Sequence, residues 1–218
     1  MDIEKLYQIN KEISQCEYIL TKNPPCSRDI SSKPLFMNPV ITQRILLISR
    51  DPSNIANSNE TLIGFKNTFF KNHVLSSFFR DYDKNIAKAD ENYFKKYSDK
   101  FYQLVYWTHY SKCYPGKTKT GHKPAKVFCS ELYLNREIKA VSPDSVILMG
   151  KDVIEFLTKD SVINSISKNE NNFLKINNIN IPVICLTHPS NANNGCKSNP
   201  KYRFKETIEQ IHANIEKY

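Results

Sequence analysis

The sequence predicts an α/β fold in which helices cover both faces of a mainly parallel, four-stranded sheet. Four short apolar runs have the composition of buried strands, and they occupy residues 44–49, 104–108, 145–149 and 181–187. The segments between these runs are longer, and several have apolar residues at helical spacing. Alternating strands and helices are typical of a parallel sheet with right-handed crossovers, which gives a three-layer α/β/α sandwich.

The helices can be placed from the same spacing. Residues 2–20 have an amphipathic period, and the stretch 67–103 is mostly helical. A further helix begins at Pro124, which suits a first helical turn, and ends near Val141. The pair Asn177-Asn178 predicts a hairpin turn before the last strand. The C-terminal helix has a buried stripe made of Phe204, Ile208, Ile211 and Ile215.

Length and charge limit the class of protein. The 218 residues suffice for one domain with a substantial core, and no repeat or linker divides residues 1–218. The net charge of +9 favours a polyanionic partner, although a solvated lysine-rich surface explains it equally well. No apolar run reaches about 18 residues, so we expect no membrane span. The N-terminus lacks the apolar centre of a signal peptide, so we expect a cytoplasmic protein. We also expect a monomer.

Two polar segments begin where predicted strands end. Asp51-Pro52-Ser53 follows the first strand, and His188-Pro189-Ser190 follows the last. In an open α/β sheet, ligands bind beyond the carboxyl ends of the strands, so a carboxylate and an imidazole there can face one crevice. Each also has a structural explanation, Asp51 as a turn or cap residue and His188 as a strand-end histidine. The sequence has no Gly-rich phosphate loop, which disfavours a nucleotide-cofactor enzyme.

These two segments resemble the active-site motifs of the uracil-DNA glycosylase superfamily. The first is similar to the Gly-Gln-Asp-Pro-Tyr-His motif of the classical branch, and the second resembles the superfamily's His-Pro-Ser segment. Thr108-His109-Tyr110-Ser111-Lys112-Cys113 is similar to the Thr-Asn-x-x-Lys-Cys motif of the iron–sulfur branch, and Cys129 follows Cys113 at that branch's interval. The resemblance spans residues 44–195, is closest to the iron–sulfur branch, and implies the superfamily's fold.

Three positions depart from the motifs. Ser49-Arg50 replaces the Gly-Gln or Gly-Glu start of the first motif. His109 stands where the superfamily usually has the Asn that reads the amide edge of uracil. The N-terminal Cys-x-x-Cys is absent, because the next cysteine after Cys16 is Cys26. These departures predict altered base specificity or lost activity.

The resemblance implies a role for each candidate catalytic residue. Cleavage of an N-glycosidic bond places positive charge on the sugar and negative charge on the departing base. Asp51 would stabilise the sugar cation and orient or deprotonate water, and His188 would donate a hydrogen bond to the base. The base must also leave the stack and lie against an aromatic ring, for which Phe65 is the first candidate and Phe69 or Phe70 the alternatives.

Further residues are expected at the substrate. His109 would hydrogen-bond the base edge or merely cap its strand, and Ser190 and Asn193 would contact the substrate or merely form turns. Residues 112–126 form a basic loop, whose lysines would bind phosphates by counterion release unless they form only a solvated face. These lysines are Lys112, Lys117, Lys119, Lys123 and Lys126, of which Lys117, Lys119 and Lys123 are the main DNA-binding candidates.

The resemblance also implies a [4Fe–4S] cluster that positions the basic loop. Its ligands would be Cys16, Cys26, Cys113 and Cys129. A zinc site or buried thiols without metal are the alternatives. We therefore expect a monofunctional DNA glycosylase that removes uracil or a related damaged base and leaves an abasic site. The alternative is a catalytically weak, iron–sulfur or zinc-stabilised nucleic-acid-binding protein.

Overall fold

Five strands form the main sheet of the described residues, in the order β2-β1-β5-β7-β6. The computed structural model describes residues 1–16, 26, 33–52, 61–118, 121–122, 126–168, 172–188 and 204–218. The parallel strands are β1 (Ile45–Ser49), β2 (Val105–His109), β5 (Ser145–Met149) and β7 (Ile179–Leu186). The prediction of a mainly parallel sheet is thus confirmed.

The fifth strand is the difference from the predicted four-stranded sheet. β6 (Phe173–Ile176) pairs antiparallel with β7 at the edge of the sheet. The turn between them is the predicted one, since Asn177 and Asn178 have φ values of 50° and 67°, which asparagine tolerates better than most residues. Outside this hairpin, every residue of β1, β2 and β5 is buried, as is typical of strands covered on both faces.

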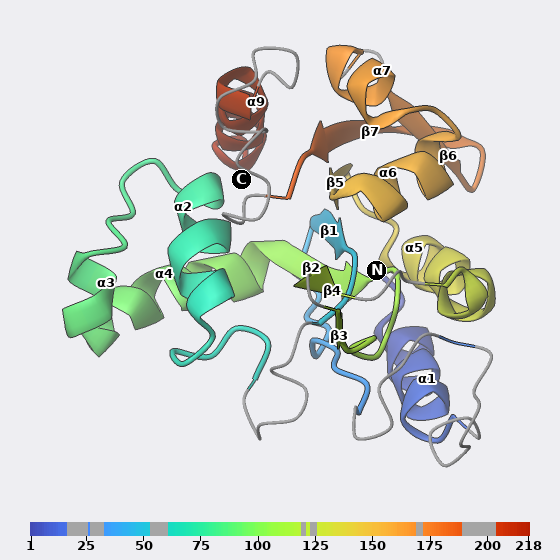
Figure 1. The fold of residues 1–218 in the computed structure, drawn as a ribbon, viewed down its shortest axis with the longest axis horizontal. Helices are drawn as coiled ribbons and strands as arrows, with labels where there is room; N and C mark the ends of the chain where they lie inside the picture. Colours follow the sequence, from blue (N-terminus) through green and yellow to red (C-terminus); the bar gives the residue numbers. More distant parts are fainter. Residues whose placement is uncertain are drawn as a thin grey trace.

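Helices cover both faces of the sheet (Figure 1). One side carries α2 (Leu75–Phe78), α3 (Ile86–Ala89), α4 (Glu91–Leu104) and α9 (Phe204–Ile215). The other carries α1 (Ile3–Ser14), α5 (Asn135–Val141) and α6 (Lys151–Thr158), and α7 (Val162–Ser167) packs against α6 and β7. This arrangement is the predicted α/β/α sandwich.

The helix ends follow local chemistry. α1 begins where Asp2 accepts a hydrogen bond of 3.0 Å from the backbone of Lys5, and it ends at Ser14, short of the predicted residue 20. Residues 17–20 and Pro124 lie outside the described residues. Helical structure before α5 starts at residue 128 and continues through the π-helical turn η4 (Ser130–Leu134). α5 ends as predicted, where Ser142 adopts a left-handed conformation.

The strand order reverses between β1 and β5. The chain passes from β1 to its neighbour β2 and then returns to β5 on the other side of β1. A crevice forms at the carboxyl ends of strands at such a reversal, so this edge is where a ligand is expected. None of the described helices has the length and apolar character needed to cross a lipid bilayer.

Candidate active site

Three candidate residues lie at the carboxyl edge of the sheet. His109 is the last residue of β2, Asp51 lies just after β1, and His188 lies just after β7. Because these strands are parallel, their carboxyl ends share one edge. Neighbouring strands are about 4.8 Å apart, so the ends of β2 and β7 are about 14 Å apart across the site.

Asp51 is a nearly buried carboxylate held by its neighbour. Its side chain is 3% exposed, and its Oδ2 accepts a hydrogen bond of 2.7 Å from Arg50 Nε. The backbone here is fixed to the end of β2, because Ser111 N–H donates to the carbonyl of Arg50 at 2.8 Å. The ion pair compensates for the cost of burying this charge.

His109 is a buried imidazole without a hydrogen-bond partner among the described residues. It is 1% exposed, and neither ring nitrogen is bonded. Burial lowers its pKa from 6.5 to about 3, with a further lowering by the Lys112 cation and an opposing effect of Asp51. The ring is therefore neutral and offers one donor and one acceptor. An unmade buried hydrogen bond costs about 1–3 kcal/mol, so a ligand that supplies the partner would bind favourably.

A row of aromatic rings connects the two histidines. Phe69 stacks on His188 with ring centroids 4.8 Å apart and an angle of 14° between the planes. Its centroid is 6.5 Å from that of Trp107, which in turn is 5.5 Å from that of His109. Trp107 is fixed to β1, because its Nε1 donates to Ser49 Oγ at 2.9 Å. These contacts place His109, Phe69 and His188 on one face of the sheet.

The start of the helical segment determines which phenylalanine reaches His188. Asn67 Oδ1 accepts from the backbone N–H of Phe70 at 3.0 Å, which sets the first turn before η3 (Phe70–Val74) and brings Phe69 to the site. Phe65 lies elsewhere, with its ring edge-on to Phe94 at 5.3 Å. The structure thus brings the alternative Phe69, and not Phe65, to His188.

The expected phosphate contact of Lys112 is wrong, because its side chain points into the protein. Lys112 is 2% exposed and forms an ion pair with Glu137, which is fully buried. Its Nζ also donates to Thr108 Oγ1 at 2.8 Å and to the carbonyl of His109 at 2.7 Å. Lys112 therefore ties the end of β2 to α5, where the sequence suggested a solvated basic loop.

Removing this lysine should destabilise the protein strongly. In Lys112→Met the Glu137 carboxylate stays buried without its cation, and we expect the free energy of unfolding to fall by about 3–5 kcal/mol. The double variant Lys112→Met/Glu137→Leu should recover most of this loss, since it buries no charge. Urea denaturation measures both. A single-variant loss below about 1 kcal/mol would contradict the buried ion pair.

Of the remaining main candidates for contact with DNA or the substrate, the structure describes only Lys117. Lys117 is exposed in β3 (Lys117–Thr118), which pairs with β4 (Gly121–His122) in a short hairpin. Lys119 and Lys123 lie outside the described residues, as do Ser190 and Asn193.

Three of the four candidate cluster cysteines lie close together, and the fourth, Cys16, lies near them. Cys26, Cys113 and Cys129 are buried, and a hydrogen bond with Cys26, then burial and the nearby Cys113, raise the pKa of the Cys129 thiol. Cys16 is hydrogen-bonded to Tyr133, close to this group. In the described part of the chain, no group of three or more His, Cys, Asp or Glu side chains is placed to hold a metal ion.

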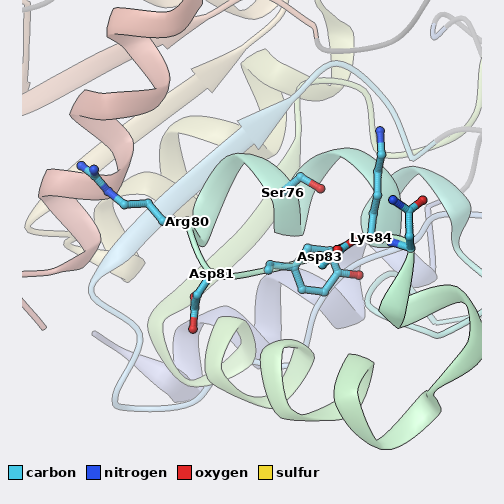
Figure 2. Close-up of a pocket in the computed structure, with 7 residues that line it drawn as sticks. Ser76, Arg80, Asp81, Asp83 and Lys84 are labelled. Carbon is cyan, nitrogen blue, oxygen red and sulfur yellow. Dashed lines mark hydrogen bonds between the residues drawn. The ribbon is translucent and has the colours of Figure 1, made fainter.

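A pocket of about 440 Å³ is lined by Ser76 of α2 and by residues 80–85, which follow α2 in the chain (Figure 2). Two of its charged side chains, Arg80 and Asp81, are already paired with neighbours. In Figure 2, Arg80 extends toward α9, where it forms ion pairs with Glu209 at 2.6 Å and Glu216 at 3.1 Å. Asp81 accepts a hydrogen bond from Tyr97 at 2.7 Å. None of the candidate catalytic residues lines this pocket.

The family comparison covers both the sheet and the site. A model of the uracil DNA glycosylase superfamily matches residues 37–212, from before β1 into α9. The chain therefore belongs to the uracil DNA glycosylase superfamily, whose members are typically DNA glycosylases. The matched region contains Asp51, His109 and His188. No curated protein matches the chain.

Proposed function

We propose that this protein is a monofunctional DNA glycosylase that hydrolyses the N-glycosidic bond of uracil or a related damaged base and leaves an abasic site. One observation carries the proposal. Three side chains lie at the same edge of the sheet: the buried carboxylate of Asp51, the neutral imidazole of His109, and the His188 ring, which stacks on Phe69. Among the described residues, the His109 ring has no hydrogen-bond partner. Superfamily membership supports DNA as the substrate.

The chemistry of bond cleavage assigns a task to each side chain. As the glycosidic bond breaks, the sugar gains positive charge, which the Asp51 carboxylate stabilises while it orients the attacking water. The departing base gains negative charge, which a hydrogen bond from His188 stabilises. Both contacts are stronger in the transition state than in the bound substrate, so they accelerate the reaction.

Binding of the extruded base uses the rest of the site. Phe69 would stack on the base with the ring face that His188 does not cover, and the neutral His109 ring would offer one hydrogen bond to the base edge. An imidazole contacts a single group of that edge, whereas a carboxamide contacts two, so we expect weaker discrimination among deaminated bases. Ser190 and Asn193 would add substrate contacts, and Lys117, Lys119 and Lys123 would bind phosphates.

The test is base release from a panel of oligonucleotides. Purified protein is incubated with strands that contain one uracil, hypoxanthine or xanthine, and alkali then cleaves at abasic sites. We expect cleavage at one or more of the modified positions and none at normal bases. If no modified base is released, the catalytically weak DNA-binding protein becomes the better explanation.

We propose further that Cys16, Cys26, Cys113 and Cys129 hold a [4Fe–4S] cluster, as in the iron–sulfur branch. The Cys26–Cys129 hydrogen bond and the nearby Cys113 bring three of these thiols close together. The described side chains are not placed as a ready-made metal site, so cluster binding would have to draw the ligands together. Neighbouring thiols oppose ionisation of Cys129, and a bound cation would reverse that effect. The cluster would be structural, because its ligands Cys113 and Cys129 would hold the basic loop of residues 112–126 in place.

Iron analysis checks the cluster. Protein purified without oxygen should contain about four iron atoms per chain. Cys113→Ser should lower the iron content and the thermal stability, whereas Cys185→Ser should leave the iron unchanged, because Cys185 lies within β7. Iron-free protein of normal stability would contradict the cluster, and bound zinc would favour the zinc-stabilised alternative.

A further inference from the structure

Arg50 joins two carboxylates at the edge of the candidate site. Its Nε lies 2.7 Å from Asp51 Oδ2 and 3.9 Å from Asp152 Oδ2, in the first turn of α6. The Arg50 side chain is 29% exposed and that of Asp51 is 3% exposed. The guanidinium thus lies at the rim of the site, and the carboxylate lies inside it.

We propose that Arg50 is a positioning residue that orients the Asp51 carboxylate and keeps it ionised during base release. This inference rests on the proposed function, in which Asp51 stabilises the sugar cation. A nearly buried carboxylate without a partner would take up a proton to avoid the cost of burying its charge. A charge-assisted hydrogen bond from Nε removes that tendency, and it also limits rotation of the carboxylate.

Two neighbouring basic side chains, His109 and Lys112, do not supply this positive charge. His109, across from β1 at the end of β2, is buried and neutral and contributes no positive charge. Lys112, which lies just beyond it, is paired with Glu137. Asp152 on α6 also attracts the guanidinium, with its Oδ2 3.9 Å from Arg50 Nε. Arg50 is therefore a cation in direct contact with the Asp51 carboxylate, at 2.7 Å.

The position between two acids has a chemical consequence. Asp152 shares the positive charge of Arg50, so Asp51 is not fully neutralised by its partner. A carboxylate that is paired with a shared cation binds a proton weakly, but it still has a net negative potential around it. It is suited to stabilising a developing cation more than to removing a proton from water.

The proposal is tested by the pH dependence of single-turnover base release. In Arg50→Gln we expect the acid limb of the profile to move upward by about one pH unit or more, because an adjacent Arg favours a carboxylate by about 1–3 units. At a pH on that limb the rate should fall about tenfold or more. Arg50→Lys should restore the position of the limb but only part of the rate, since an ammonium lacks the planar fork.

A second measurement needs no catalysis. The carboxyl carbon of Asp51 is titrated by ¹³C NMR in the DNA-free protein, with Asp51→Asn to assign the signal. Arg50→Gln should move the midpoint to higher pH. If the midpoint and the acid limb both stay unchanged, or if the rate falls equally at every pH, Arg50 does not control Asp51 and the proposal is overturned. If the parent releases no base, the proposed function fails, and the NMR midpoint still decides the role of Arg50.

Discussion

Replacing Asp51 with Asn, or His188 with Ala, is expected to slow single-turnover base release by about 10²–10³-fold, with little change in DNA affinity. Asn keeps the size of the side chain and can still accept a hydrogen bond from Arg50, but it loses the charge that stabilises the sugar cation. Ala removes the imidazole that stabilises the departing base. Both groups act mainly in the transition state, so the rate falls and ground-state binding does not.

Two control variants make this result specific. His188→Phe keeps a ring that can stack on Phe69 but has no N–H, so it should be as slow as His188→Ala. Asp99→Asn removes an exposed carboxylate of α4 and should release base at the parent rate. Parent rates in both Asp51→Asn and His188→Ala would show that this site is not catalytic.

Acidification should destabilise the protein through His109. Its pKa is about 3 in the folded protein and about 6.5 in the unfolded chain, so between these values the unfolded state binds one more proton. The stability from this group is complete above about pH 6.5 and is lost as the pH falls toward 3. The expected slope is about 1.4 kcal/mol per pH unit, and the total reaches about 5 kcal/mol.

The variant His109→Asn isolates this effect, because Asn does not titrate. Urea denaturation between pH 7 and pH 4 should give a shallower dependence for the variant than for the parent protein. The difference between the two slopes is the quantity to compare, since carboxylates titrate in both proteins. Parallel curves would mean that His109 is not buried and neutral in the folded protein.

The strands and the two strand-end motifs could be predicted because they depend on local sequence. The strand at 145–149 has the predicted bounds, and the Asn177-Asn178 turn joins β6 to β7. β6 itself was not predicted, since four residues with a mixed burial pattern give a weak signal. Asp51 and His188 follow β1 and β7 as the apolar runs indicated.

The partners of Lys112 and His188 could not be predicted, because they come from distant parts of the chain. A lysine in a basic loop gives no local sign of burial, and the partner of Lys112 is 25 residues further along. Phe69 reaches His188 because Asn67 caps the first helical turn. Asn67 lies two positions before Phe69, and as a polar cap residue it could have indicated the helix start. In the sequence, Arg50 is only a departure from the family motif. Its contact with Asp152 could not be predicted, because Asp152 lies about 100 residues further along, on α6.

The most direct test of glycosylase activity is the mass of the DNA product formed in H₂¹⁸O. A strand with a single uracil is incubated with the protein, and the intact strand and the released small molecule are both analysed by mass spectrometry. Hydrolysis of the N-glycosidic bond predicts free uracil and, in equal amount, an unbroken strand that has lost the base and gained one ¹⁸O from water at the sugar. Strands with hypoxanthine or xanthine should give the same abasic strand together with free hypoxanthine or xanthine, if those bases are accepted. A strand whose mass stays unchanged with every one of these bases, although it binds the protein, would contradict the proposed glycosylase activity.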